Sequence, residues 1–580
     1  MIIRFTLLAL CFLSLGCATG KRDETLQINS NSEAPSARSE NIKKSVSERH
    51  FPKDSLYKLL SAEFALRRNF YPLALSSYLE EARILRDPNL SAHTTRIASF
   101  LRKRTAAKES AQLWVELSPE DPRANLTLGE ILIASGELLD AIPYLAVAAS
   151  DGKEVNFPEL LKQYEKLTSS EKIVLQHELK ALTLKLPENI NLLLTVAILN
   201  QSNGKNKEAI ALLKRILNLN PNHQRSILLK SSIQLEEGSP NALSDIRQAI
   251  KLNPKDSKLR LEYAKLLTRK DLAESRRQFE ILSAESPKNS ELLLSLALIN
   301  QEIGDIFAAK AYLQKLIAKQ QKANEARTLL ARISESENDL QKALIHYSLV
   351  EDGPEFLFAN NRIGEILLNA NQLSNFANHF NRARSRQTHL GEELFLLEAN
   401  LLSKDGFFHE SLGVFSRGIA LYPNSLNLRY NRSIVAESIN DLKLAEQDLR
   451  LIIASHPNNA AALNALGYTL ANKTNRLAEA YELISKALQL KPKEPAILDS
   501  MGWILYKQER YEKALEFLRK AYDLLPDPEV AAHIGEVLWI TGKTQAAKEI
   551  WEEANKISPG HKVLKETLKR FKTNEFQLKS

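Results

Sequence analysis

The spacing of its prolines is the feature of this sequence that most limits the folds open to it. Prolines that close helical segments recur every 33, 34 or 35 residues, or at about twice that interval: Pro119, Pro187, Pro221, Pro254, Pro287, Pro354, Pro423, Pro457, Pro492, Pro526 and Pro559. A proline ends a helix because it lacks an N–H and restricts the residue before it. At 580 residues the chain is also much longer than a single-core domain. The period therefore predicts an array of repeated helical units.

Small residues recur at matching positions between these prolines. Three such sets are Gly502, Ala514 and Ala521; Gly535, Ala547 and Ala554; and Ala197, Ala209 and Ile216. Small side chains let paired helices approach closely. A period near 34 with this pattern is typical of tetratricopeptide (TPR) repeats, each a helix–turn–helix. One pair cannot bury its apolar stripe alone, so we expect an all-α TPR solenoid, a right-handed superhelix of about 15 units.

Two stretches keep the proline spacing but lack clear small residues at the matching positions, and they suggest domain boundaries. These stretches are residues 151–187 and 371–394. We predict an N-terminal TPR module over residues 51–187 and a C-terminal superhelix over 188–559. Residues 560–580 are predicted to form a capping helix with a basic tail.

The first residues have the pattern of an export signal. "MIIRFTLLALCFLSLGC" has one charge, Arg4, an apolar core too short to span a bilayer, and then Gly16-Cys17. A small residue before Cys resembles the bacterial lipobox, which predicts a signal peptide over 1–17 and acylation, including palmitate, at Cys17. A plain secretory signal is the alternative, and a transmembrane anchor is disfavoured by the charged "ATGKRDE" that follows. By resemblance, Ala18 after the Cys implies the outer membrane, with the lipid-anchored chain on its periplasmic face.

The segment 18–50 is polar and has few large apolar residues. Such a segment cannot bury enough surface to offset its ordering entropy. We predict a flexible tether between the lipid and the folded body.

The sequence contains no motif that indicates catalysis. It has no Walker A loop, dinucleotide fingerprint, HExxH or GxSxG, and its 11 histidines are scattered singly. Both cysteines, Cys11 and Cys17, lie in the signal region, so no thiol site is available in the repeats. We expect no enzyme activity, no metal and no cofactor. The basic tail is interpreted as a solvated end rather than a nucleic-acid site.

The first helix of each TPR unit lines the concave face of the solenoid, where partners bind. Counting back from the closing prolines places aromatic, amide and charged residues there: Tyr430, Asn464, Tyr468, Asp499, Trp503, Tyr506, Lys507 and Trp539. Rigid aromatic and amide side chains are good anchors for a peptide or helix. The alternative is that the aromatic residues pack in the repeat core, since an error of one position would bury them.

Two regions resemble more than a generic TPR protein. Residues 88–145, with "ESAQLWVELSPEDPRANLTLGEILIASGELLDAIPYL", and 460–551, with "DSMGWILYKQERYEKALEFLRKAYDLLP", are similar to a family of large Gram-negative TPR lipoproteins. Its type member is the lipoprotein binding partner of a periplasmic carboxyl-terminal processing protease. The resemblance implies a non-enzymatic adaptor that binds this serine protease and brings it cell-wall hydrolases, notably peptidoglycan cross-link hydrolases.

Two other functions are compatible with a TPR array. A TPR lipoprotein that assembles an envelope machine, such as a pilus or secretin, is a second interaction-class hypothesis, but such factors have about six repeats by resemblance. A TPR arm of a glycosyltransferase would require a catalytic domain, and only about twenty residues follow Pro559.

Overall fold

The computed structural model describes residues 52–577, and all its regular structure in that range is helical. The predicted signal peptide with Cys17 and the predicted tether over 18–50 lie outside the described residues. The chain divides into two compact units, Met1–Asp305 and Ile306–Ser580. This division falls within the segment predicted as one C-terminal superhelix, so each unit is described separately.

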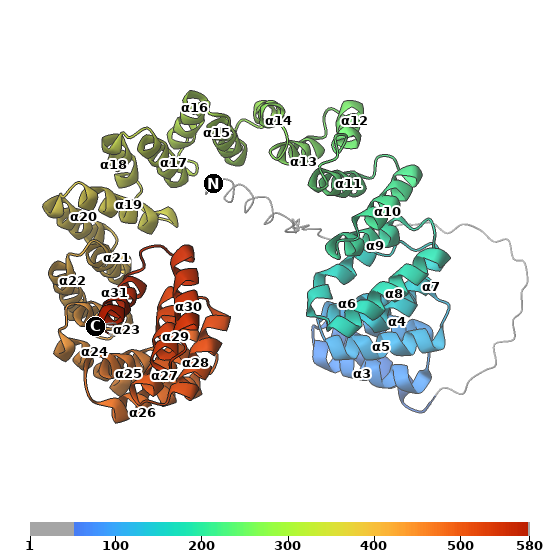
Figure 1. The fold of residues 1–580 in the computed structure, drawn as a ribbon. Helices are drawn as coiled ribbons and strands as arrows, with labels where there is room; N and C mark the ends of the chain where they lie inside the picture. Colours follow the sequence, from blue (N-terminus) through green and yellow to red (C-terminus); the bar gives the residue numbers. More distant parts are fainter. Residues whose placement is uncertain (1–51, 578–580) are drawn as a thin grey trace, which may run out of the picture. The chain divides into compact units, whose positions relative to one another are not determined.

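The first unit contains helices α2 to α15 and the 3₁₀ helix η1 (Figure 1). Their bounds are α2 Ser55–Arg67, α3 Tyr71–Leu85, α4 Pro88–Phe100, α5 Arg104–Leu117, α6 Pro122–Ser135, α7 Leu138–Ser150, η1 Phe157–Lys166, α8 Ser169–Lys185, α9 Ile190–Ser202, α10 Asn206–Leu219, α11 Gln224–Glu236, α12 Ser244–Leu252, α13 Ser257–Leu267, α14 Leu272–Glu285 and α15 Ser290–Ile303.

The second unit contains α16 to α31 and the short 3₁₀ helix η2. Their bounds are α16 Ile306–Ala318, α17 Ala323–Ser336, α18 Leu340–Ser348, α19 Glu355–Asn369, α20 Leu373–Arg386, η2 Thr388–Leu390, α21 Gly391–Lys404, α22 Phe408–Leu421, α23 Leu426–Ser438, α24 Leu442–Ser455, α25 Ala460–Lys473, α26 Leu477–Leu490, α27 Pro495–Lys507, α28 Tyr511–Leu524, α29 Pro528–Ile540, α30 Thr544–Ile557 and α31 Lys562–Gln577.

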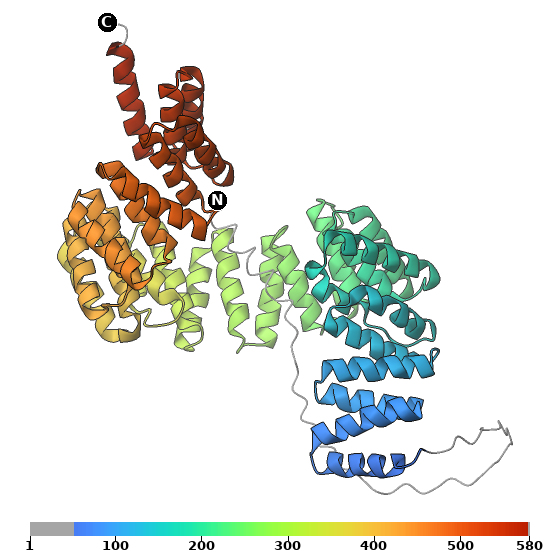
Figure 2. The same ribbon diagram turned by 90° about the horizontal axis from the view of Figure 1, so that it is seen from below.

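The helices follow one another as antiparallel pairs, which confirms the predicted all-α TPR fold. In the first unit the pairs are α2/α3, α4/α5, α6/α7, α9/α10, α11/α12 and α13/α14, and in the second unit they are α17/α18, α19/α20, α21/α22, α23/α24, α25/α26, α27/α28 and α29/α30. In Figure 2 the helices of the first pairs (blue) lie one above another. Most closing prolines stand just after the second helix of a pair: α28 ends at Leu524, two residues before Pro526. Pro354 differs, because it precedes α19 as its N-cap.

The two helices of a pair begin and end differently, and the residue types explain why. Most first helices have a polar N-cap: the Asn459 side chain accepts a hydrogen bond from the Ala462 N–H, and Asp527 accepts one from the Glu529 N–H. The turn inside most pairs places one residue in the left-handed region, with φ of 87° at Gly406 and 65° at Asn440. Glycine and asparagine adopt this conformation most readily. Local sequence therefore defines the ends of each pair.

The small residues lie where the helices of a pair cross. A Cβ added at Gly502 would lie 2.5 Å from Leu518 Cγ, and one at Gly467 would lie 2.6 Å from Ile484 Cγ1. Ala514 and Ala521 are completely buried. The predicted close approach of paired helices is thus present in the structure. Residues 157–166, in a stretch without clear small positions, form the 3₁₀ helix η1, which contacts α9.

Helix α31 packs against the last pair, α29/α30. It contacts α29 and α30, and its Leu564 and Phe571 are buried. The Phe571 ring lies 5.6 Å from the Trp539 ring and 5.3 Å from the Trp551 ring. Its apolar stripe covers the end of the core that would otherwise face water.

Candidate partner-binding site

The predicted site residues lie on the first helices of consecutive pairs in the second unit. Tyr430 is on α23, Asn464 and Tyr468 are on α25, the run Asp499–Lys507 lies in α27, and Trp539 is on α29. Helices α25 and α27 contact each other, as do α27 and α29. In Figure 1 these first helices lie on one side of the second unit, with α24, α26 and α28 outside them. The structure therefore brings most of the predicted residues onto one surface.

A buried polar cluster links α25, α27 and α29, and we call it the inner-face cluster: Tyr468, Asp499, Trp503, Glu529 and His533. The Tyr468 hydroxyl donates a hydrogen bond to Glu529 Oε1 at 3.0 Å, across 61 residues of sequence. His533 Nδ1 lies 2.9 Å from Asp499 Oδ1. The Trp503 ring stacks on the His533 ring at 4.0 Å. These contacts hold three successive units in register.

Trp503 belongs to the packing beneath the surface, whereas Lys507 lies on the surface. Trp503 is only 5% exposed, and its Nε1 has no hydrogen-bond partner. The exposed Lys507 places its Nζ 4.8 Å from the centre of the Trp503 ring. Tyr506 is half-buried, with its ring 5.0 Å from that of Trp503. A partner would therefore meet Lys507 and the edge of Tyr506 rather than the Trp503 ring.

Asn464, Tyr430 and Trp539 are half-buried around the cluster. The Asn464 Oδ1 makes no hydrogen bond, and its Nδ2 is 3.5 Å from the Ala496 carbonyl oxygen. The Trp539 ring stacks on Trp551 at 5.8 Å. The Asn464 Oδ1 is itself buried, so this oxygen is not open to a partner although the residue is half-buried.

The electrostatics of the cluster are dominated by carboxylates. Burial opposes protonation of His533, but Asp499, Glu529 and Glu536 together raise its pKa above the usual value. Burial also raises the pKa of Glu437 on α23, against the effect of Lys473. Burial raises the pKa of Tyr468, and the negative charge of the nearby Glu529 raises it further. The site is a partly buried acidic surface in which the carboxylates favour the protonated form of His533.

Glu529 and Arg570 are members of this surface that the sequence reasoning missed. Glu529 lies one helical turn before His533 on α29, a spacing that puts both on one face. Arg570, on α31, donates a hydrogen bond to Glu536, which also accepts one from Thr567 at 3.1 Å. The i, i+4 spacing of Glu529 and His533 could have indicated Glu529 as a member of the surface. No pattern within α31 indicates Arg570.

We predict that the stability of this end of the second unit falls as pH rises past the His533 pKa. The folded-state pKa is raised, so the stabilisation from the charged ring is complete below the unfolded value of about 6.5 and is lost as pH rises through the folded value. Urea unfolding at a series of pH values, followed by tryptophan fluorescence, measures this. Asp499→Asn should flatten the dependence; an unchanged slope would contradict the assignment to this pair.

The described part of the chain shows neither a metal centre nor a membrane span. Across residues 52–577 no three His, Cys, Asp or Glu side chains are grouped so that they could hold a metal ion. None of the helices in the same range is long and apolar enough to cross a membrane.

The repeats are similar in sequence to tetratricopeptide repeats of known proteins. Tetratricopeptide repeat models match residues 445–495 and 495–528, which include α25 to α28. The TPR repeat-containing protein PA4667 of Pseudomonas aeruginosa is 37% identical over 489 residues, covering 84% of this chain and 82% of the relative. The chain belongs to the tetratricopeptide repeat proteins. Such TPR proteins generally act as scaffolds for protein–protein interaction.

Three further proteins are similar to this TPR protein over a smaller part of the chain or at lower identity. The type IV pilus assembly protein PilF of Pseudomonas aeruginosa is 23% identical over 165 residues, covering 26% of this chain and 65% of PilF. The human protein O-mannosyl-transferase TMTC1 is 30% identical over 178 residues, covering 30% of this chain and 20% of the transferase. Yeast Tom70 aligns over 91% of this chain and 96% of its own at 14% identity, with a TM-score of 0.34.

Proposed function

We propose that this TPR protein is a non-enzymatic scaffold, lipid-anchored through Cys17 at the periplasmic face of the outer membrane. In this proposal it binds a periplasmic carboxyl-terminal processing protease and presents cell-wall hydrolases to it. A tethered repeat array can hold two clients together and raise their effective concentration without an active site of its own.

The observation that carries the proposal is the surface formed by α25, α27 and α29. The inner-face cluster holds these helices in register, while Lys507, Tyr506 and Asn464 remain available beside it. A rigid platform with a few accessible polar and aromatic groups suits a peptide or helix from a partner.

A pull-down with paired variants tests the proposal. The tagged chain should capture a PDZ-containing serine protease and a cell-wall endopeptidase from envelope extract. Asn464→Ala with Lys507→Glu should weaken protease capture by about 10-fold, because Lys507 is exposed at this surface and the half-buried Asn464 lies beside it. The control is Gln489→Ala with Lys513→Glu, which makes the same charge change at exposed positions on α26 and α28.

Two results would contradict this function. One is equal protease capture by the two double variants, which would place the contact elsewhere. The other is a deletion strain in which the level of every cell-wall hydrolase is unchanged.

The likeness to PilF supports a second candidate, an assembly factor for an envelope machine such as a pilus or a secretin. It rests on 165 residues at 23% identity. In that case the same pull-down would recover envelope-machine subunits, and the deletion strain would lose the machine while keeping its hydrolase levels.

A further inference from the structure

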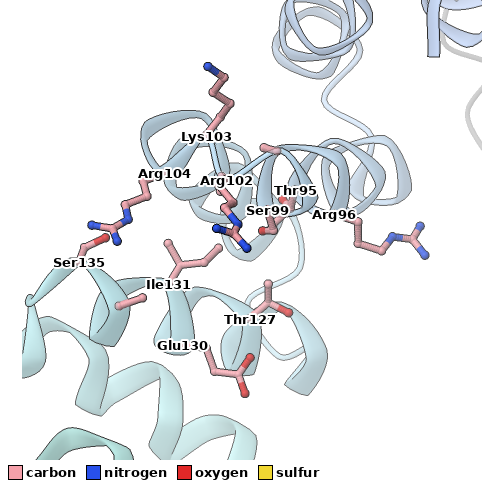
Figure 3. A pocket seen from close by; sticks show the side chains of 13 residues that line it. Thr95, Arg96, Ser99, Arg102, Lys103, Arg104, Thr127, Glu130, Ile131 and Ser135 are labelled. Carbon is pink, nitrogen blue, oxygen red and sulfur yellow. The ribbon is translucent and has the colours of Figure 1, made fainter. Parts of the chain in front are cut away.

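The first unit contains a basic cleft that the proposed function does not use. A cavity of about 530 Å³ lies between α4 and α6, bordered by the turn into α5 (Figure 3). These are the first helices of neighbouring pairs, the same class of helix that carries the candidate site in the second unit. We call this cavity, with the cations of its rim, the basic cleft.

Four cations surround the basic cleft: Arg96, Arg102, Lys103 and Arg104. In Figure 3 the Arg102 and Arg104 side chains extend toward α6, and the Arg104 guanidinium lies near Ser135; Arg96 and Lys103 turn outward. Arg102 occupies the left-handed turn position with φ of 55°, where most other pairs have glycine or asparagine and α27/α28 has Glu509. That conformation costs a non-glycine residue about 1 kcal/mol, so this arginine is not favoured there by the fold.

These cations are not neutralised within the described chain. None of the four takes part in an ion pair there, whereas basic residues of the same pairs do: Arg83 with Glu109, and Lys108 with Glu137. Unpaired positive charge around one cavity attracts an anionic group, and arginine binds carboxylates in a bidentate geometry.

The residues on the floor of the cleft favour a peptide over a phosphate as its ligand. It is formed by Ala98, Ala107, Ile131 and Ala134, and its one acidic residue is Glu130. An apolar floor accepts a hydrophobic side chain, which a phosphate does not have, and Glu130 can accept a hydrogen bond from a peptide N–H. A second cavity of about 340 Å³ shares Glu130 and Ala134 and continues toward η1.

We propose that the basic cleft binds an acidic, partly apolar segment of a partner protein. Asp or Glu side chains of the segment pair with Arg102 and Arg104, and an apolar side chain lies on the floor between α4 and α6. This inference rests on the proposed function only in treating the chain as a protein scaffold; it needs neither the protease nor the site in the second unit.

Selection from a random library of displayed 12-residue peptides tests this, because the partner sequence is unknown. The purified full chain should enrich peptides with Asp or Glu next to Leu, Ile or Phe. Arg102→Glu with Arg104→Glu should abolish that enrichment. The matched control is Lys180→Glu with Lys185→Glu, the same charge change at exposed positions on α8 of the same unit.

An enriched peptide is then titrated by fluorescence anisotropy. We expect about 10-fold weaker binding after Arg102→Glu with Arg104→Glu, a similar loss when Asp and Glu of the peptide become Asn and Gln, and weaker binding at high salt. Two results would overturn the proposal. One is equal binding of the peptide by both double variants. The other is displacement of the peptide by inorganic phosphate or by phosphatidylglycerol vesicles at lower concentrations than by acidic peptide. The proposed function is tested separately, by measuring how much protease the variant Arg102→Glu with Arg104→Glu captures.

Discussion

Gly535→Ala is expected to destabilise the C-terminal end of the second unit, although alanine is ordinarily the better residue inside a helix. The added Cβ would lie 2.0 Å from the Trp551 Nε1 and 2.2 Å from its Cε2. Trp551 is buried, and its indole N–H donates to the Ala532 carbonyl oxygen at 3.2 Å. The ring cannot move without losing this bond, so we expect a loss of about 3 kcal/mol from overpacking.

Hydrogen exchange of the α29 to α31 amides measures this loss where it occurs, since a repeat array can unfold in parts. The control is Gly413→Ala on α22, where the nearest atom to an added Cβ is Arg417 Nη1 at 3.8 Å. There the ordinary helix preference should apply, with a gain of up to about 1 kcal/mol. Equal effects at the two positions would show that contact with Trp551 does not control the packing of this pair.

Arg432→Met is expected to destabilise the second unit by about 3 kcal/mol, because it leaves a buried carboxylate without its main partner. Asp448 on α24 is completely buried. Arg432 on α23 donates two hydrogen bonds to it, from Nε at 2.7 Å and from Nη2 at 2.8 Å. Arg429 Nη1 lies farther away, at 3.5 Å, and compensates only in part.

The double variant Arg432→Met with Asp448→Leu separates the charge from the packing. An apolar pair of similar volume removes the uncompensated charge, so it should recover most of the stability lost in the single variant. Urea unfolding of the three proteins gives the comparison. A double variant less stable than Arg432→Met would show that the arginine contributes by its shape and not through Asp448.

The repeat architecture could be predicted from the sequence because it depends on local features. Prolines such as Pro526, left-handed turn residues such as Gly406, and small residues such as Gly502 each act within one pair. The stretch 151–187, where the small positions are blurred, contains the 3₁₀ helix η1. The positions of the candidate residues on the first helices also follow from the period.

The surroundings of the individual side chains could not be predicted, because they depend on neighbouring units. Trp503 is buried because α29 brings His533 onto its face, and Tyr468 finds Glu529 two units further along the chain. The sequence alone left open whether these aromatic residues face a partner or the core.

Arg102, Lys103 and Arg104 are an ordinary basic run in the sequence, and they surround a cavity only because α4 packs beside α6. The period by itself determined the repeated helical pairs, since every signal for them lies within about 34 residues. The tertiary structure decided which side chains are available to a partner, since burial is set by contacts between one unit and the next.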